Sequence, residues 1–178
     1  APATLVRCFD KRLIYGLASR VGVPVAPWRA FGAGEAWRRC AGQMGFPLVV
    51  KRKDSSSQVR GRKAIILPGP EALEALLAET ASDPDAASLV LQKFAPGRRH
   101  NCHIAAADGR LIAYFQQKVL RTDELDGTGI GVAGVSVAPS AALREYCERL
   151  TRSLSYTGIG CIQFMVDERT GSVALLEF

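Results

Sequence analysis

Residues 160–178 read GCIQFMVDERTGSVALLEF, a pattern that predicts two strands joined by a polar turn. Gln163 and Asp167 alternate with apolar residues in the first strand, and Gly171 offers the positive φ that a short hairpin loop requires. A loop of three or five residues would place Gln163 and Glu177 on one face, and with five they would stand directly opposite. A loop of four residues would place them on opposite faces.

The carboxylate of Glu177 stands in an otherwise apolar strand, where burial is costly unless something pairs with it. Mg²⁺ is a suitable partner because it prefers hard oxygen ligands. The hairpin therefore makes Gln163 and Glu177 candidate metal ligands. Periodicity alone favours the alternative, in which Glu177 lies on a solvated strand face, so the rest of the chain has to decide.

The composition is that of a globular protein, with 178 residues and 48% apolar residues. This length allows one well-cored domain or two small lobes. No apolar run is long enough to cross a bilayer, and residues 1–10 lack the apolar core of a signal peptide. The chain starts without Met and stops at a bare strand, so we expect it to be a piece of a longer chain.

The charge balance of +6, from 23 basic and 17 acidic residues, admits a nucleic-acid partner. Basic residues cluster only at 51–53, 60–63 and 98–100, in predicted loops or strand ends. Nucleotide phosphates or a solvated surface explain these clusters as well as RNA does, and no row of exposed aromatics accompanies them. The five cysteines are odd in number and lack zinc-ligand spacing, which favours reduced thiols in a cytoplasmic protein.

The N-terminal part predicts two helices. Asp10 caps the first, which Gly22 ends, and the second covers about 34–44. Lys11 lies in the first turn, where the helix dipole disfavours a cation. We therefore regard Lys11 as a candidate for reaching an anion, with a solvated lysine as the alternative.

A phosphate cradle is predicted after the buried strand 46–51, which ends in Lys51 and leads into a loop containing Ser55, Ser56 and Ser57. Backbone N–H groups and hydroxyls of such a loop can approach phosphate oxygens while the lysine neutralises charge. The signal is weak alone, and the loop lacks the Walker pattern.

The remaining segments alternate between strands and helices. Strands are predicted at 63–67, 89–94, 101–107 and 110–118, the last pair joined by an Asp-Gly turn and ending in Lys118. Helices begin near Pro70 and after Ser140, and the glycine-rich stretch 123–135 is predicted to be a mobile loop.

The ordered set of motifs resembles the nucleotide-binding part of ATP-grasp enzymes, over about residues 10–178. The set comprises FPLVVK at 46–51, the serine loop, LVLQKFAPG at 89–97, the hairpin ending in Lys118, and the terminal hairpin with LLEF at 175–178. The resemblance implies an α/β (α+β) ATP-grasp fold, in which two lobes with mostly antiparallel sheets grip the nucleotide. The lobes are expected at 1–93 and 94–178, the second cut short at its metal hairpin.

The resemblance also implies roles for individual residues. Lys51 would contact phosphates beneath a covering loop at 54–63, and Lys118 would act near the terminal phosphate as the catalytic lysine. Gln163 and Glu177 would hold the metal, with Asp167 as the fallback. The other implied nucleotide-binding residues are Lys11, Ser55, Ser56, Ser57, Gln92, Lys93, Phe94 and Ala95, the last four meeting adenine through their backbone.

Three departures from the family pattern stand out. Serines replace the usual loop glycines, Gln92 stands where a glutamate is frequent, and Gln163 stands at a position that is often acidic. Family members usually continue after the Glu177 position with Asn-Pro-Arg, which this chain does not contain. The expected piece is therefore incomplete and need not be active alone.

The implied function is that of an ATP-dependent carboxylate–amine ligase domain. It would use ATP and Mg²⁺, with Mn²⁺ as a substitute, to activate a carboxylate as an acyl phosphate for attack by an amine or another nucleophile. Its partners would be the nucleotide, small-molecule carboxylate and amine substrates, and the rest of a longer chain, with no membrane and no nucleic acid. A non-catalytic nucleotide-binding or regulatory module and a basic nucleic-acid-binding domain are the alternatives.

Overall fold

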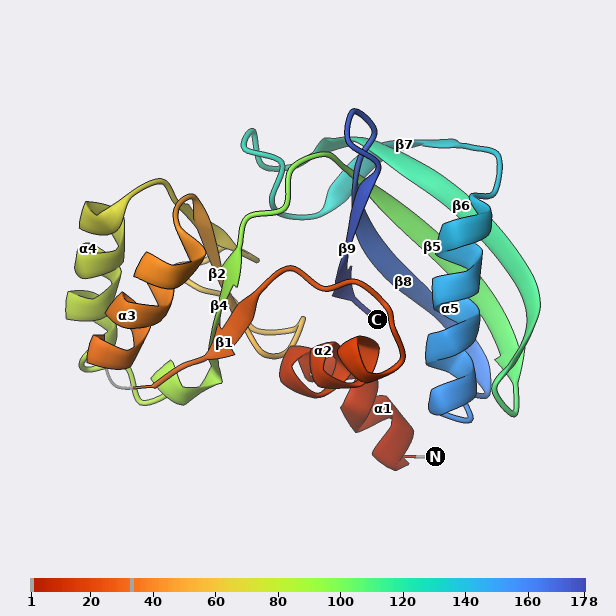
Figure 1. The fold of residues 1–178 in the computed structure, drawn as a ribbon, viewed down its shortest axis with the longest axis horizontal. Coiled ribbons are helices and arrows are strands. Elements are labelled where there is room, and N and C mark those ends of the chain that lie inside the picture. Colours follow the sequence, from red (N-terminus) through yellow and green to blue (C-terminus); the bar gives the residue numbers. More distant parts are fainter. Residues whose placement is uncertain (1, 33) are drawn as a thin grey trace. The chain divides into compact units, whose positions relative to one another are not determined.

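The computed structural model describes residues 2–32 and 34–178, and it divides the chain into two compact units (Figure 1). Residues 26–94 form the four-stranded unit, and the residues up to 25 join residues 95–178 in the five-stranded unit. The chain therefore passes between the units twice. The boundary after residue 94 lies next to the expected one, whereas the first 25 residues group with the C-terminal half.

The four-stranded unit holds an antiparallel sheet in the order β1-β4-β2-β3, built from β1 (Trp28–Ala30), β2 (Leu48–Arg52), β3 (Ile65–Leu67) and β4 (Leu89–Lys93). Helices α3 (Gly34–Met44) and α4 (Pro70–Thr80) pack on one face, and a short 3-10 helix, η1 (Ala86–Ser88), precedes β4 (Figure 1). The core between helices and sheet comprises Trp37, Leu48, Val50, Leu67, Leu73, Leu76, Leu89 and Leu91. Strands β2 and β4 are held at this core because every second side chain points into it.

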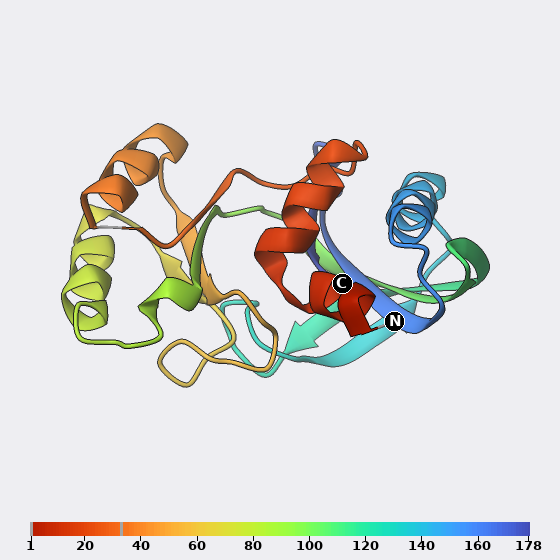
Figure 2. The same ribbon diagram turned by 90° about the horizontal axis from the view of Figure 1, so that it is seen from below.

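The five-stranded unit holds an antiparallel sheet in the order β7-β6-β5-β8-β9. Its strands are β5 (Arg98–Ala107), β6 (Arg110–Thr122), β7 (Gly131–Ser136), β8 (Gly158–Asp167) and β9 (Ser172–Glu177). Helix α5 (Ala141–Ser153) lies along β5 and β6, while α2 (Lys11–Arg20) contacts β9 and α1 (Pro2–Phe9) contacts α2 (Figures 1 and 2). Ile162 and Phe164 of β8 are fully buried, as are Cys147 and Leu150 of α5, so the sheet face that α5 covers is apolar.

Caps and turns form where the sequence predicts them. The Asp10 carboxylate accepts a hydrogen bond from the Arg12 N–H at 2.9 Å, and the Ser140 hydroxyl accepts one from the Leu143 N–H at 3.4 Å. Asp108 and Gly109 both have positive φ, 47° and 79°, as a two-residue hairpin turn requires. Gly171 also has a positive φ, 73°, which confirms its expected role in the last hairpin.

The stretch 123–135 is only partly a loop, which corrects the expectation from its glycine content. Its second half forms β7, which pairs with β6 as an edge strand. Helix α1 and the short strand β1 were also not predicted. No helix among residues 2–32 and 34–178 combines the length and apolar character needed to cross a membrane.

Candidate functional site

The last hairpin brings Gln163 and Glu177 into direct register across β8 and β9. Asp167 pairs with Ser172, so the connection at 168–171 has four residues, the length expected to separate the two side chains. The pairing shifts by one residue between Gln163 and Phe164, because Leu176 is an extra residue in β9. A four-residue loop alone would place Glu177 and Gln163 on opposite faces of the sheet. The β-bulge adds one residue to β9 and so returns Glu177 to the face of Gln163.

Helix α2 and the segment after it hold the bulge. The Tyr15 hydroxyl, on a fully buried ring, donates a hydrogen bond to the Leu176 carbonyl at 2.5 Å. The Leu175 N–H donates to the Pro24 carbonyl at 2.8 Å. A bulge leaves ladder groups without strand partners, and the Tyr15 hydroxyl satisfies one of them.

Lys11 reaches an anion within the protein itself. Its ammonium lies 3.5 Å from the Glu177 carboxylate, with side-chain exposures of 7% for Lys11 and 30% for Glu177. The unusual lysine in the first turn of α2 is thus explained by a partner on β9. A burial this complete would be costly for an ammonium without an opposite charge.

Asn101 extends the pair into a row of three polar side chains. It stands directly opposite Gln163 on β8, on the side of the sheet away from the apolar face beneath α5. Its Oδ1 is buried, and within residues 2–32 and 34–178 it has no hydrogen-bond partner. Sequence reasoning missed Asn101, although the alternation of polar and apolar residues along β5 marks it as belonging to the polar face.

Arg99, two residues earlier on β5, lies on the same polar face. Its Nη1 donates to the Gly129 carbonyl at 2.8 Å. Burial lowers the pKa of this guanidinium below its usual value, and the nearby carboxylates of Glu177 and Asp123 offset only part of that effect. The basic cluster at 98–100 thus contributes one inward-facing cation to the face that carries Gln163 and Glu177.

Lys118 lies on the opposite, helix-covered face, so the fold does not bring it to Gln163 and Glu177. A register shift in the β5–β6 hairpin between Ala105 and Ala106 pairs Lys118 with His100. Without that shift the two-residue turn would pair Lys118 with Arg99, on the polar face. The Lys118 ammonium instead contacts the Glu168 carboxylate in the last turn.

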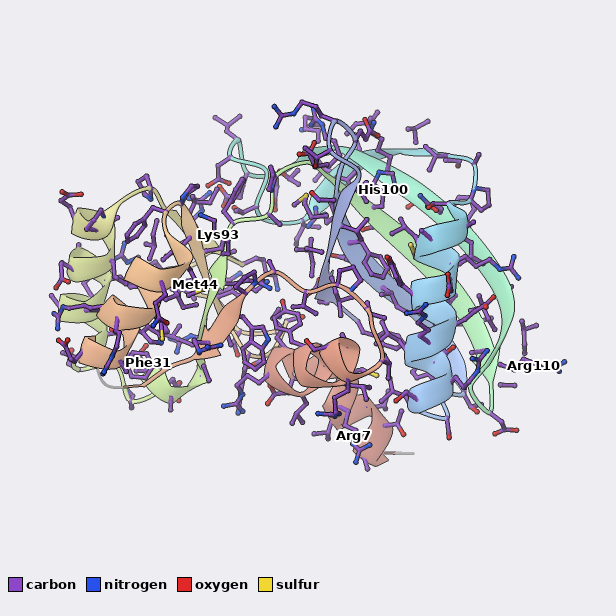
Figure 3. The ribbon with its side chains drawn as sticks, in the orientation of Figure 1. Arg7, Phe31, Met44, Lys93, His100 and Arg110 are labelled. Atoms are coloured by element: carbon purple, nitrogen blue, oxygen red, sulfur yellow. The ribbon has the colours of Figure 1, made fainter. Side chains whose placement is uncertain are left out.

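His100, labelled in Figure 3, is buried beside Lys118. Its Nδ1 and the Gln116 Nε2 are 2.9 Å apart, so Nδ1 accepts from the amide in the neutral ring. Burial lowers the pKa of His100, which favours that neutral form. His100 therefore belongs to the packing beneath α5 rather than to the polar face.

Asp167, the fallback ligand, is engaged within the turn. Its carboxylate accepts hydrogen bonds from the Thr170 hydroxyl at 2.9 Å and the Arg169 N–H at 3.0 Å. These hydrogen bonds hold the pKa of Asp167 below its usual value, and the bond from Thr170 has the largest effect. Asp167 is thus bound within the turn, whereas Gln163 and Glu177 are in register with each other.

In the four-stranded unit, Lys51 and Gln92 lie on the sheet face away from α3 and α4. Lys51 pairs with Val90, and Gln92 pairs with Val49, which places both polar side chains opposite the buried Val50 and Leu91. Both are nonetheless buried, with exposures of 7% and 3%. The Gln92 amide donates to the Ala26 carbonyl at 3.3 Å.

The serine loop is organised around Asp54. Its Oδ1 accepts hydrogen bonds from the Ser56 N–H at 3.1 Å, the Ser56 hydroxyl at 2.7 Å and the Ser57 N–H at 2.8 Å. Burial alone would raise the pKa of Asp54, but these bonds hold it well below its usual value. The donors expected to cradle a phosphate are thus occupied by a carboxylate of the loop, while the Lys63 ammonium donates to the Ser55 carbonyl at 2.6 Å.

The segment Gln92–Ala95, whose backbone is expected to meet adenine, begins inside the four-stranded sheet and continues beyond the end of β4. β4 lies between β1 and β2. The Lys93 N–H donates to the Pro27 carbonyl at 2.8 Å and the Phe94 N–H to the Pro47 carbonyl at 3.2 Å. The Lys93 ammonium, at the end of β4 in Figure 3, donates to the Gly45 and Phe46 carbonyls.

The polar face of the five-stranded unit fits a magnesium ion that is completed by substrate oxygens. No three His, Cys, Asp or Glu side chains gather into a metal site in the described part of the chain. Glu177 offers one carboxylate, and Gln163 and Asn101 offer amide oxygens, one of which is buried without a partner. Mg²⁺ commonly takes one or two protein carboxylates together with waters and phosphate oxygens.

Comparisons with known proteins identify the fold. The profile of the ATP-grasp domain matches residues 16–178. The chain superposes on an ADP complex of N5-carboxyaminoimidazole ribonucleotide synthetase with a TM-score of 0.75 and 14% identity. It also superposes on a β,γ-ATP complex of biotin carboxylase from Campylobacter jejuni, with a TM-score of 0.78 and 19% identity.

A third solved structure, D-alanine–D-alanine ligase from Bacillus anthracis, gives a TM-score of 0.66 and 19% identity. The chain is covered to 97%, 98% and 96% in these three comparisons, and it spans 45%, 40% and 56% of the other chains. A search of curated protein sequences gives no match. On the family match over nearly its whole length, the chain belongs to the ATP-grasp domain family.

Proposed function

We propose that the chain is the nucleotide-binding part of an ATP-dependent ligase and that it binds MgATP. The observation that carries the proposal is the register of Gln163 and Glu177, with Asn101 in the same row, on a polar sheet face. The family match supports the same conclusion, as do the nucleotide complexes among the structures that share its fold.

Glu177 and Gln163 are the residues that would hold Mg²⁺, which when bound neutralises charge on the β- and γ-phosphate oxygens. Lys51 would contribute a fixed positive charge to the phosphates from the polar face of the four-stranded sheet. The N–H groups of Ser56 and Ser57 would bind phosphate oxygens once these replace the Asp54 carboxylate, which now accepts their hydrogen bonds.

Adenine would be bound next to residues 94–95, where one compact unit ends and the other resumes. The N–H groups of Lys93 and Phe94 already donate to the Pro27 and Pro47 carbonyls, so Ala95 is the residue of this segment left to donate to the base. The Lys93 side chain is committed to the Gly45 and Phe46 carbonyls, which argues that its role is to fix the backbone.

The reaction proposed for the whole ligase has two steps. A carboxylate oxygen of the substrate attacks the γ-phosphorus, the bond from that phosphorus to the β-phosphate oxygen breaks, and ADP leaves. An amine then attacks the carbonyl carbon of the acyl phosphate, inorganic phosphate leaves with the electron pair of the broken bond, and the amine loses a proton. Positioning and electrostatic stabilisation supply most of the catalysis in such phosphoryl transfers.

Calorimetric titration of the chain with ATP and with GTP, each in excess Mg²⁺, tests the proposal. We expect saturable binding of ATP and much weaker binding of GTP, because the backbone near Ala95 would be matched to adenine. Equal affinities for the two nucleotides would contradict the adenine assignment. An absence of ATP binding would contradict the proposed function of this chain.

A further inference from the structure

The guanidinium of Arg99 has one nitrogen that donates a hydrogen bond to the protein and two buried nitrogens that lack a hydrogen-bond partner. Nη1 is anchored by its 2.8 Å hydrogen bond to the Gly129 carbonyl. Nε and Nη2 are buried, and across residues 2–32 and 34–178 neither finds a hydrogen-bond partner. Buried donors without partners are costly and rare in folded proteins, so these two nitrogens call for an explanation.

Nε and Nη2 form the side of the guanidinium that binds two oxygens at once, and the same chain uses this fork elsewhere. Arg38 grips the Glu74 carboxylate with it, at 2.7 Å from both nitrogens. Arg12 grips Asp10 in the same way, at 3.0 and 2.7 Å. In both cases a planar carboxylate fills the fork, which is the bidentate geometry that arginine prefers.

The surroundings of Arg99 supply no such oxyanion. Glu177 and Asp123 are near enough to attract the guanidinium, yet neither forms an ion pair with it in the described residues. Gly131 lies beside the fork, where an added Cβ would come within 3.3 Å of Nη2. Arg99 also shares its face with Asn101 and, through the strand register, with Gln163 and Glu177. The unpartnered fork therefore belongs to the same polar face as the proposed metal ligands.

We propose that the Nε/Nη2 fork of Arg99 binds an oxyanion of a ligand, either a nucleotide phosphate or the carboxylate of the substrate. The inference rests on the proposed function, because it extends that site by one residue. An incoming phosphate or carboxylate would satisfy both bare nitrogens, as Glu74 does for Arg38. The anchored Nη1 would hold the fork in place before the ligand arrives, which reduces the entropy lost on binding.

The test measures the Nε–H signals of the arginine side chains by NMR in the ¹⁵N-labelled chain. The signals are assigned through backbone connectivity and by the loss of one signal in each of the variants Arg99→Lys and Arg38→Lys. Metal-free ATP, adenosine, inorganic phosphate and acetate are titrated separately at constant ionic strength. The Arg99 signal should shift with at least one oxyanion and stay in place with adenosine. The Arg38 signal, whose fork is filled, is the matched control and should stay in place throughout.

The arms distinguish the two sources of the oxyanion. A shift with ATP and phosphate but not acetate assigns the fork to a nucleotide phosphate, and a shift with acetate alone assigns it to a substrate carboxylate. If the chain binds ATP but the Arg99 signal does not shift with ATP, phosphate or acetate, the inference about Arg99 is wrong. The proposed function is not affected by that result. A chain that does not bind ATP contradicts the proposed function, while the phosphate and acetate arms still decide the role of Arg99.

Discussion

Lys11 and Glu177 form an ion pair in which the lysine is almost completely buried and the carboxylate is 30% exposed in its side chain. The ammonium offsets the charge of Glu177. A magnesium ion on Glu177 would meet the positive charge of Lys11 at short range, so lysine and metal compete for one carboxylate. We therefore propose that Lys11 acts through Glu177, the proposed metal ligand, rather than by contacting a phosphate.

Lys11→Met tests this role at the level of one residue. The substitution keeps the aliphatic bulk and removes the charge, so Mg²⁺ should increase ATP affinity more in the variant than in the parent. We expect an additional gain of about two- to fivefold, the range for a partly screened charge pair. Calorimetric ATP affinities with and without Mg²⁺ give the measurement.

Lys51→Met is the matched control, since its charge is expected to face phosphates directly. It should lose metal-free ATP affinity by roughly tenfold or more, the size of a charge-assisted hydrogen bond. Lys11→Met should leave metal-free affinity unchanged. If Lys11→Met weakens metal-free ATP binding as Lys51→Met does, Lys11 contacts the nucleotide and our account of it is wrong.

Asp54 gives a prediction for pH. Its hydrogen bonds lower the pKa in the folded state, so the unfolded chain binds the proton more tightly. The stabilisation is then fully present above the unfolded pKa of about 4 and is lost as pH falls below it toward the folded pKa. Asp54→Asn should lower the free energy of unfolding by about 1 kcal/mol at pH 7. Urea denaturation at pH 7 and pH 3 should show the difference shrinking at the lower pH, and a constant difference would contradict the assignment.

At the scale of elements, the bulge in β9 depends on α2. The Tyr15 hydroxyl satisfies the carbonyl of the extra residue Leu176, and this contact fixes where Glu177 stands. Tyr15→Phe removes the donor and leaves a buried carbonyl unsatisfied, at a cost of about 1–3 kcal/mol. The variant should therefore unfold at lower denaturant concentration, and Mg²⁺ should raise its ATP affinity less than it does in the parent.

Tyr114→Phe separates the two effects. The Tyr114 hydroxyl donates to Gln116 at 2.8 Å beneath α5, away from the polar face. Its loss should destabilise the same unit while leaving the Mg²⁺ dependence of ATP binding intact. If Tyr15→Phe and Tyr114→Phe change that dependence equally, the bulge does not position the metal ligand.

The sequence predicts most elements but not the two register shifts that decide the site. Alternation and the turn glycine are enough to predict the last hairpin. The bulge at Leu176 cannot be predicted from the local sequence, because Tyr15, which binds the Leu176 carbonyl, lies 161 residues away along the chain. The shift between Ala105 and Ala106 is equally hidden, and it moves Lys118 to the other face. A shift of one residue exchanges the two faces of a strand, so one bulge decides which face a side chain occupies.

At the scale of the whole chain, both units follow one plan: a sheet with helices on one face and polar side chains on the other. Lys51 and Gln92 occupy the polar face in the four-stranded unit, and Arg99, Gln163 and Glu177 occupy it in the five-stranded unit. The resemblance to ATP-grasp enzymes implies this mixed α/β class, and the family match confirms it. Periodicity does not predict that α1 and α2 belong to the second unit, because the hydrogen bonds and ion pair that tie α2 to β9 are long-range.

The Mg²⁺ dependence of ATP affinity in the parent chain and in Glu177→Gln, measured by calorimetry, tests the central claim most directly. Glutamine preserves the shape of the side chain and removes the one carboxylate of the proposed metal site. We predict that Mg²⁺ raises ATP affinity in the parent, that this gain disappears in Glu177→Gln, and that metal-free ATP affinity stays nearly the same. A variant that keeps the full gain from Mg²⁺ would show that Glu177 does not hold the metal.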